Sequence, residues 1–213
     1  MQEELLRFKS NQKFCLWDYE TCHLNLRWGD NKPWQLAYII ADQKKIYHKE
    51  DVYLWWDELN ISPEAARITG FNRSVYEKRA VDPKKSLSDF RKILHDKDVI
   101  PAGHNILGFD VYIESIHARE SGLPVNHSYI PRCMDTNCLE KAIIEEIPYN
   151  KNTSFIGWQY ALSKFRKRGL KTSLQQCAKK YGIDFDPNKL HDALYDIGIN
   201  LEVLKKQLWK IEI

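Results

Sequence analysis

The sequence predicts an α/β protein with a mixed sheet. Apolar stretches of strand length, separated by turn residues, open the chain, and stretches of helical periodicity follow. One more short apolar stretch, residues 99–102, lies among those helices. A strand meander followed by a strand between helices favours a sheet with both antiparallel and parallel neighbours. The 213 residues are enough for one domain with a full core.

The first strands follow directly from residue type. Residues 14–21 form an apolar run, and the polar stretch 23–33 after it contains the turn sequence Gly29-Asp30-Asn31. Residues 34–41 are mostly apolar and predict a second strand, and residues 44–48 could return as a third. These three segments predict an antiparallel meander.

The helices are marked by caps and by apolar spacing. Ser62, Pro63 and Glu64 supply a capping hydroxyl, a proline at the first helical position and an acid in the first turn of a helix that ends near Gly70. Further helices are expected at residues 86–95, 108–121, 136–146, 155–165, 174–181 and 192–209. Residues 148–154 are polar and predict a loop.

Composition narrows the setting without identifying a function. The formal charge of +3 is nearly balanced and does not by itself indicate a polyanionic partner. The five cysteines are odd in number and include no Cys-x-x-Cys pair, which argues against a disulfide framework or a structural zinc site. Residues 1–13 do not read as a signal peptide, and no apolar run reaches membrane-spanning length, so we expect a cytoplasmic protein.

Two carboxylates stand on the first strand. Asp18 and Glu20 are two residues apart, so their side chains point to the same face, while Trp17 and Tyr19 face the opposite layer. Adjacent carboxylates on a buried strand repel one another, and a divalent cation between them would relieve that repulsion. The alternative is an edge strand with one solvated acidic face.

Two more acids and a histidine complete a candidate set. Asp110 is expected in the first turn of a helix, where simple capping would also explain it. Asp196 interrupts an apolar helical face, and an unpaired buried carboxylate is costly. His191 and Asp196 would point about 140° apart on one regular helix, so they converge only if His191 lies in the loop before it.

Three short motifs, in order, resemble a known family. They are Asp18-Tyr19-Glu20-Thr21, then His104-Asn105 followed by Phe109-Asp110, and His191-Asp192-Ala193-Leu194-Tyr195-Asp196. The sequence resembles the DEDDh (DnaQ-like) 3′–5′ exonucleases, which include polymerase proofreading subunits, ribonuclease T, oligoribonuclease and the TREX enzymes. Weaker similarities occur at residues 63–70, 135–136, 173–174 and 182–183. The chain departs from the frequent family pattern at Cys22-His23, directly after the first motif.

The resemblance carries expectations about fold and chemistry. It implies a ribonuclease H-like fold with a five-stranded mixed sheet, as a single exonuclease domain over residues 1–213 with a possible insertion at 148–170. The carboxylates of Asp18, Glu20, Asp110 and Asp196 would hold two Mg²⁺ or Mn²⁺ ions, and His191 would be the general base. The product would be a nucleoside 5′-monophosphate released from a 3′ end.

The resemblance also suggests how the substrate is held. The partner would be a nucleic acid with a free 3′ end, single-stranded DNA in the first place, with a polymerase partner or a homodimer as further options. The expected substrate contacts are Tyr19, Thr21, Leu24, Asn105 and His191.

A basic segment offers a second substrate-handling feature. Residues 164–180 contain seven lysines and arginines and no acid, and they follow Phe155, Trp158 and Tyr160. Cations beside aromatics suit phosphate neutralisation and base stacking on a single strand. A solvated helix face over a core aromatic cluster is the alternative.

Three other functions compete with a DNA exonuclease. The same chemistry could act on RNA, because no motif reports a contact to the 2′-hydroxyl. A nucleic-acid-binding module could keep the fold without catalysis, although the intact set of four carboxylates and a histidine argues against it. A phosphohydrolase of another kind could use the same two metals.

Overall fold

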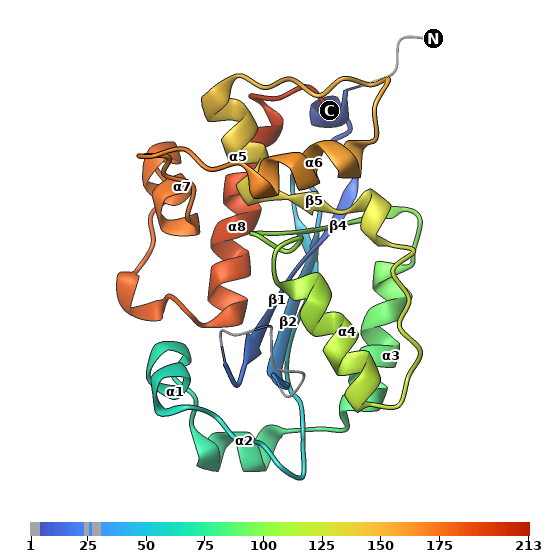
Figure 1. The fold of residues 1–213 in the computed structure, drawn as a ribbon, viewed down its shortest axis with the longest axis vertical. Helices are drawn as coiled ribbons and strands as arrows, with labels where there is room; N and C mark the ends of the chain where they lie inside the picture. The colour runs from blue at the N-terminus through green and yellow to red at the C-terminus, as the bar shows by residue number, and fades with distance from the viewer. Residues whose placement is uncertain (1–4, 24–25, 27–30) are drawn as a thin grey trace.

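The computed structural model describes residues 5–23, 26 and 31–213 (Figure 1). In this part of the chain five strands form one mixed sheet in the order β3-β2-β1-β4-β5. The strands are β1 (Lys13–Thr21), β2 (Pro33–Ala41), β3 (Ile46–Tyr53), β4 (Val99–Gly103) and β5 (Met134–Asp135). β1, β2 and β3 pair antiparallel, whereas β4 runs parallel to both β1 and β5. The predicted mixed sheet is confirmed.

Helices cover both faces of the sheet. They are α1 (Pro63–Thr69), α2 (Arg73–Arg79), α3 (Pro83–Leu94), α4 (Asp110–Glu120), α5 (Thr136–Glu145), α6 (Phe155–Lys164), α7 (Leu174–Tyr181) and α8 (Ala193–Leu208). Short 3₁₀ turns occur at Leu6–Phe8, Ile130–Arg132 and Pro187–Lys189. In Figure 1, α3 and α4 lie on one side of the strands and α8 on the other.

The alternation along β1 divides the core in two. Trp17 and Tyr19 pack with α3 and α4, whereas Phe14 and Leu16 pack with α5 and α8. Because successive strand side chains point to opposite faces, Asp18 belongs to the α8 face. The prediction that Trp17 and Tyr19 face the layer opposite to Asp18 and Glu20 is confirmed.

Most predicted helices are found, and their caps explain where they begin and end. Ser62 Oγ accepts the backbone N–H of Ala65 at 3.1 Å, and Gly70 closes α1 in the left-handed conformation at φ 66°. A left-handed residue ends a helix at little cost when it is glycine, which has no Cβ. α7 and α8 lie within one residue of their predicted limits.

Several boundaries differ from the prediction. β3 begins at Ile46 rather than residue 44, because the Asp42 carboxylate accepts the N–H groups of Lys44 and Lys45 and makes a turn of them. α3 begins at Pro83, capped by Asp82, and α4 begins at Asp110. α2 and β5 were not predicted, since seven and two residues are too short to show a period.

Within the described residues, every helix is too short or too polar to cross a lipid bilayer.

Candidate active site

β1 presents two carboxylates toward α8. Asp18 and Glu20 are both half-buried, opposite Ala37 and Gln35 on β2. Neither carboxylate makes a hydrogen bond to another described residue, so their oxygens are available for other partners. The predicted placement of the two acids on one face of the strand is therefore observed.

The third carboxylate, that of Asp110, lies near the point where the pairing of β4 with β1 ends. The parallel pairing ends with Leu16 opposite Ala102, and the backbone N–H of Tyr19 instead donates to Asp110 Oδ1 at 3.0 Å. Gly103 makes this departure possible, because a Cβ there would lie 2.9 Å from the carbonyl oxygen of Trp17 and would clash with Ile106. Asp110, only 2% exposed, thus lies against the backbone between Asp18 and Glu20.

Asp135 holds the loop that carries Asp110. Its buried carboxylate accepts the backbone N–H groups of Asn105 at 3.0 Å and Leu107 at 3.1 Å, and it also caps α5. The sequence predicts Asp135 only as the start of a helix and as part of a family pair. Its cap role was visible in the sequence, but its bonds to a loop 30 residues away depend on the tertiary fold.

The loop before α8 brings His191 beside Asp196. Asp192 caps the helix by accepting the Tyr195 N–H at 2.8 Å, and His191 precedes it with φ of 69°. The backbone N–H of His191 donates to Asp196 Oδ2 at 3.0 Å. His191 therefore lies in the loop, as its convergence with Asp196 requires.

Burial and neighbouring negative charges raise the pKa values of all four carboxylates. Burial raises the pKa of Asp18 to about 7, with the negative charge of Asp196 adding to it. Burial also raises the pKa of Asp196 to about 6, although the His191 N–H opposes the rise. The pKa of Glu20 is well above its usual range because of burial and the charges of the other three acids.

Asp110 follows the same pattern. Burial, and then the charge of Asp18, raise its pKa well above the usual range. Coulombic effects of this size act only between near neighbours. These mutual effects indicate that three distant stretches of the chain approach one another here.

The donor set suits a hard divalent cation. All four side chains offer carboxylate oxygens, and Asp196 Oδ1 is buried without a hydrogen-bond partner, which is costly for a polar atom. In the conformation described, however, no three His, Cys, Asp or Glu side chains of the described residues already surround a common metal position.

The side chains of two predicted substrate contacts, Tyr19 and Thr21, are buried in this structure. The Tyr19 side chain is 3% exposed on the opposite face, where its hydroxyl pairs with His117 Nδ1 at 2.9 Å. Thr21 is also buried, and its hydroxyl donates to the His23 carbonyl at 2.6 Å. Both follow from strand alternation, which turns residues 19 and 21 away from Asp18 and Glu20. Asn105 is exposed, and Leu24 lies outside the described residues.

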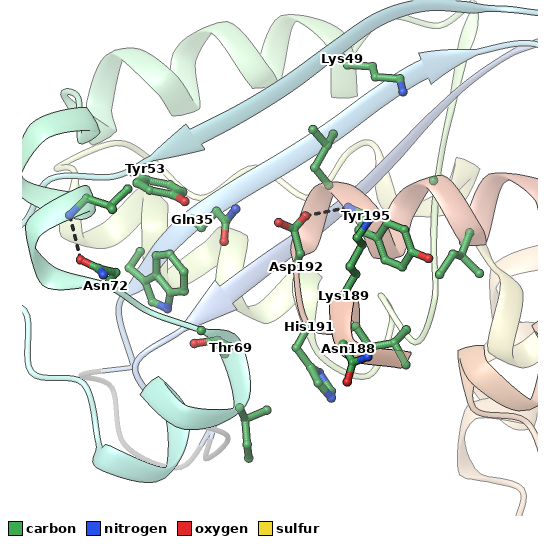
Figure 2. A pocket seen from close by; sticks show the side chains of 18 of the residues that line it. Gln35, Lys49, Tyr53, Thr69, Asn72, Asn188, Lys189, His191, Asp192 and Tyr195 are labelled. Carbon is green, nitrogen blue, oxygen red and sulfur yellow. Dashed lines mark hydrogen bonds between the residues drawn. The ribbon is translucent and has the colours of Figure 1, made fainter. Parts of the chain in front are cut away.

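A pocket of about 910 Å³ adjoins the acids on the β3 side (Figure 2). It lies between the end of α1 and the loop before α8, and its lining includes Gln35, the β2 neighbour of Glu20. In Figure 2 the ring of His191 points toward the space between Thr69 and Asn188. The lining also includes Lys49, Tyr53, Arg67, Lys189 and Tyr195. Tyr195 belongs to the third motif and Arg67 to the weaker similarity at residues 63–70, but sequence reasoning gave neither a role, and it missed Lys49, Tyr53 and Lys189, which share no motif or spacing.

Comparison with known proteins finds similarity in structure only. No protein-family model and no curated protein matches the sequence. Escherichia coli Exonuclease I in complex with a dT13 oligonucleotide matches with a TM-score of 0.72 and 17% identity over 93% of this chain and 41% of that chain. The zinc-bound form of the Exonuclease I–single-stranded DNA complex matches with a TM-score of 0.69 and 18% identity over 91% of this chain and 40% of that chain. The apo form of Exonuclease I matches with a TM-score of 0.68 and 16% identity over 91% of this chain and 41% of that chain.

The chain thus spans about two fifths of the length of the Exonuclease I chains. At this level of identity the likeness concerns the fold. The mixed five-stranded sheet flanked by helices is the ribonuclease H-like fold that the sequence resemblance implies.

Proposed function

We propose that this protein is a metal-dependent 3′–5′ exonuclease that removes nucleotides from single-stranded DNA. The observation that carries the proposal is that the pKa values of Asp18, Glu20, Asp110 and Asp196 are all raised, by burial and by neighbouring charges, while the N–H of His191 bonds to Asp196. The fold is shared with Exonuclease I, whose structures include complexes with oligonucleotides. A binding module would gain nothing from such a repulsive cluster.

The chemistry is the hydrolysis of the last phosphodiester bond. The four carboxylates would hold two Mg²⁺ or Mn²⁺ ions, which when bound stabilise charge on both the attacking and the leaving oxygen. The imidazole of His191 accepts a proton from the attacking water, whose oxygen bonds to phosphorus while the bond to the 3′ oxygen breaks. A nucleoside 5′-monophosphate leaves, and the shortened strand keeps a 3′ hydroxyl.

The substrate end would enter beside His191. The 910 Å³ pocket combines aromatic rings with the cations Lys49, Arg67 and Lys189, which suits a nucleotide with its phosphate. Asn105, exposed on the turn before Asp110, is the proposed contact on the other side. Leu24 remains a proposed contact from the first motif. A polymerase partner or a homodimer remains a prediction, which size-exclusion chromatography with and without a polymerase would test.

One assay tests the proposal. The protein is incubated with 5′-labelled single-stranded DNA, duplex DNA or RNA in Mg²⁺, Mn²⁺ or EDTA. We expect a ladder of 3′-shortened single-stranded DNA that EDTA abolishes, with duplex DNA and RNA degraded more slowly. Asp18→Asn should lose activity at least about 10²-fold, because it removes one carboxylate that positions the metals.

The matched control is Asp89→Asn, which removes an α3 surface carboxylate paired with Lys85 and Lys92. It should remain fully active. An Asp18→Asn protein as active as wild type, or a ladder that persists in EDTA, would refute the assignment.

A further inference from the structure

A basic groove runs along residues 165–173, the segment that connects α6 to α7. It consists of two adjoining pockets of about 790 and 460 Å³, which share Lys167 and Leu170 in their linings. Figure 1 shows this connection between α6 and α7 beside α5. The stretch belongs to the basic segment singled out in the sequence.

The larger pocket carries an excess of positive charge. Lys167, Arg168, Lys171, Lys179 and Lys180 line it, with Glu145 as the acid among the lining residues. Lys167 pairs with Glu145 at 2.7 Å and Lys180 with Glu140 at 2.6 Å. Among the described residues, Arg168, Lys171 and Lys179 have no ion-pair partner, and all three are exposed. Unneutralised cations gathered in one groove favour a polyanion.

The smaller pocket extends this charge to the turn that precedes Asp110 in the chain. Its lining includes His104 and Asn105, which form the turn leading to Asp110, together with Lys141 and Arg166. Asp135 fixes that turn through the N–H of Asn105. One end of the groove therefore lies at Asn105, five residues before Asp110 in the sequence, and the groove continues to Lys179.

The aromatics next to the basic segment do not face this groove. Phe155 and Trp158 stack on each other at 5.8 Å and pack against the core under α5 and α8, and Tyr160 packs against the other core. Phe165 lines the smaller pocket, but lysines and arginines outnumber aromatic side chains along the groove, which therefore offers mainly charge. Such a surface contacts phosphates and does not distinguish bases.

We propose that this groove binds the backbone phosphates of the single strand on the 5′ side of the cleaved bond. The proposal rests on the proposed function, which places the 3′ end at His191. In this proposal Arg168, Lys171 and Lys179 bind phosphates without regard to base sequence, and this binding makes longer strands better substrates than short ones. An acidic protein or an anionic membrane would not account for the continuity with the turn at Asn105.

The test compares two triple variants of equal charge change. Arg168→Ala/Lys171→Ala/Lys179→Ala removes the unpaired cations of the groove, and Lys78→Ala/Lys84→Ala/Lys97→Ala removes exposed lysines on and after α2 and α3. Binding of a fluorescent 20-nucleotide strand is measured by anisotropy in EDTA, at several salt concentrations. Hydrolysis of the p-nitrophenyl ester of thymidine 5′-monophosphate and of 3- and 20-nucleotide strands is measured with Mg²⁺.

The groove variant should bind the 20-nucleotide strand at least about 10-fold more weakly, with the salt slope reduced by about 2 for three lost phosphate contacts. It should hydrolyse the nitrophenyl ester like wild type, and the control triple variant should match wild type throughout. Equal affinity of the two triple variants, or equally tight binding of polyglutamate to wild type, would overturn the groove proposal. A wild-type protein that hydrolyses no substrate would refute the proposed function instead, while the anisotropy result would still decide the groove.

Discussion

His191 combines an unfavourable backbone conformation with a position at the candidate site. A residue with a Cβ at φ of 69° costs about 1 kcal/mol relative to ordinary backbone. The N–H bond to Asp196 Oδ2 and the Asp192 cap hold it there. These two hydrogen bonds therefore offset the strain and keep His191 in the loop next to Asp196.

We predict that His191→Ala lowers turnover of single-stranded DNA by about 10²–10⁴-fold, the usual effect of losing a general base. Metal binding, measured by Mn²⁺ titration, should stay within twofold of wild type, because the backbone N–H to Asp196 remains. His48→Ala, which removes another exposed histidine on β3, serves as the control and should remain active. Retention of full turnover by His191→Ala would exclude the imidazole as the base.

At the scale of elements, the site depends on how the β4–α4 loop is held. Gly103 lets the chain turn away from β1, and Asp135 then fixes the turn through two backbone N–H groups of the loop. The same carboxylate accepts the N–H groups of Asn137 and Cys138 at the start of α5. One buried side chain thus fixes Asp110 and the first turn of α5 relative to each other.

We predict that Asp135→Asn destabilises the protein by about 2–4 kcal/mol, because an amide NH₂ would replace an oxygen that accepts a backbone N–H. The activity that survives should show a raised metal requirement, since Asp110 would be held less firmly. Urea unfolding and Mg²⁺ dependence of the rate measure the two effects. The comparable variant Asp82→Asn at the cap of α3 should change stability only slightly and leave the metal requirement unchanged.

For the molecule as a whole, buried histidines make stability depend on pH. His117 is fully buried on α4, where Nδ1 faces the Tyr19 hydroxyl and Nε2 faces the carbonyl of Pro83, both at 2.9 Å. Burial, with a further contribution from the positive charge of Arg91, lowers its pKa to about 4. The imidazole is therefore neutral in the fold at pH 7, with Nε2–H donating and Nδ1 accepting.

Because the folded pKa of His117 lies below its usual value of about 6.5, the unfolded chain takes up the proton first. Its contribution to stability is complete above about pH 6.5 and is lost as the pH falls toward 4. We expect this group to cost on the order of 3 kcal/mol over that interval. Urea unfolding at pH 7.5 and pH 5 should show a smaller loss for His117→Gln than for wild type, and equal losses would contradict the assignment.

Much of the fold could be predicted because its signals are local. The alternation around Trp17 and Tyr19, the Ser62-Pro63 helix start and the apolar spacing of α8 each need only neighbouring residues. The candidate acids could be found for the same reason, since Asp18 and Glu20 share a face by strand geometry alone. Strand alternation also predicts that the side chains of Tyr19 and Thr21 turn away from Asp18 and Glu20, so their proposed substrate contacts rest on the family motif alone.

The sequence by itself therefore determined the class of sheet, most helices and which acidic side chains had to be explained. Only the tertiary structure decided that Asp110 bonds the backbone of β1, that Asp135 fixes its loop, and that cations of residues 165–180 border the turn at Asn105. The physical reason is that these contacts join residues far apart in the chain. Which residues meet in these contacts depends on how the helices pack on the two faces of the sheet, and the local spacing of apolar residues does not report that packing.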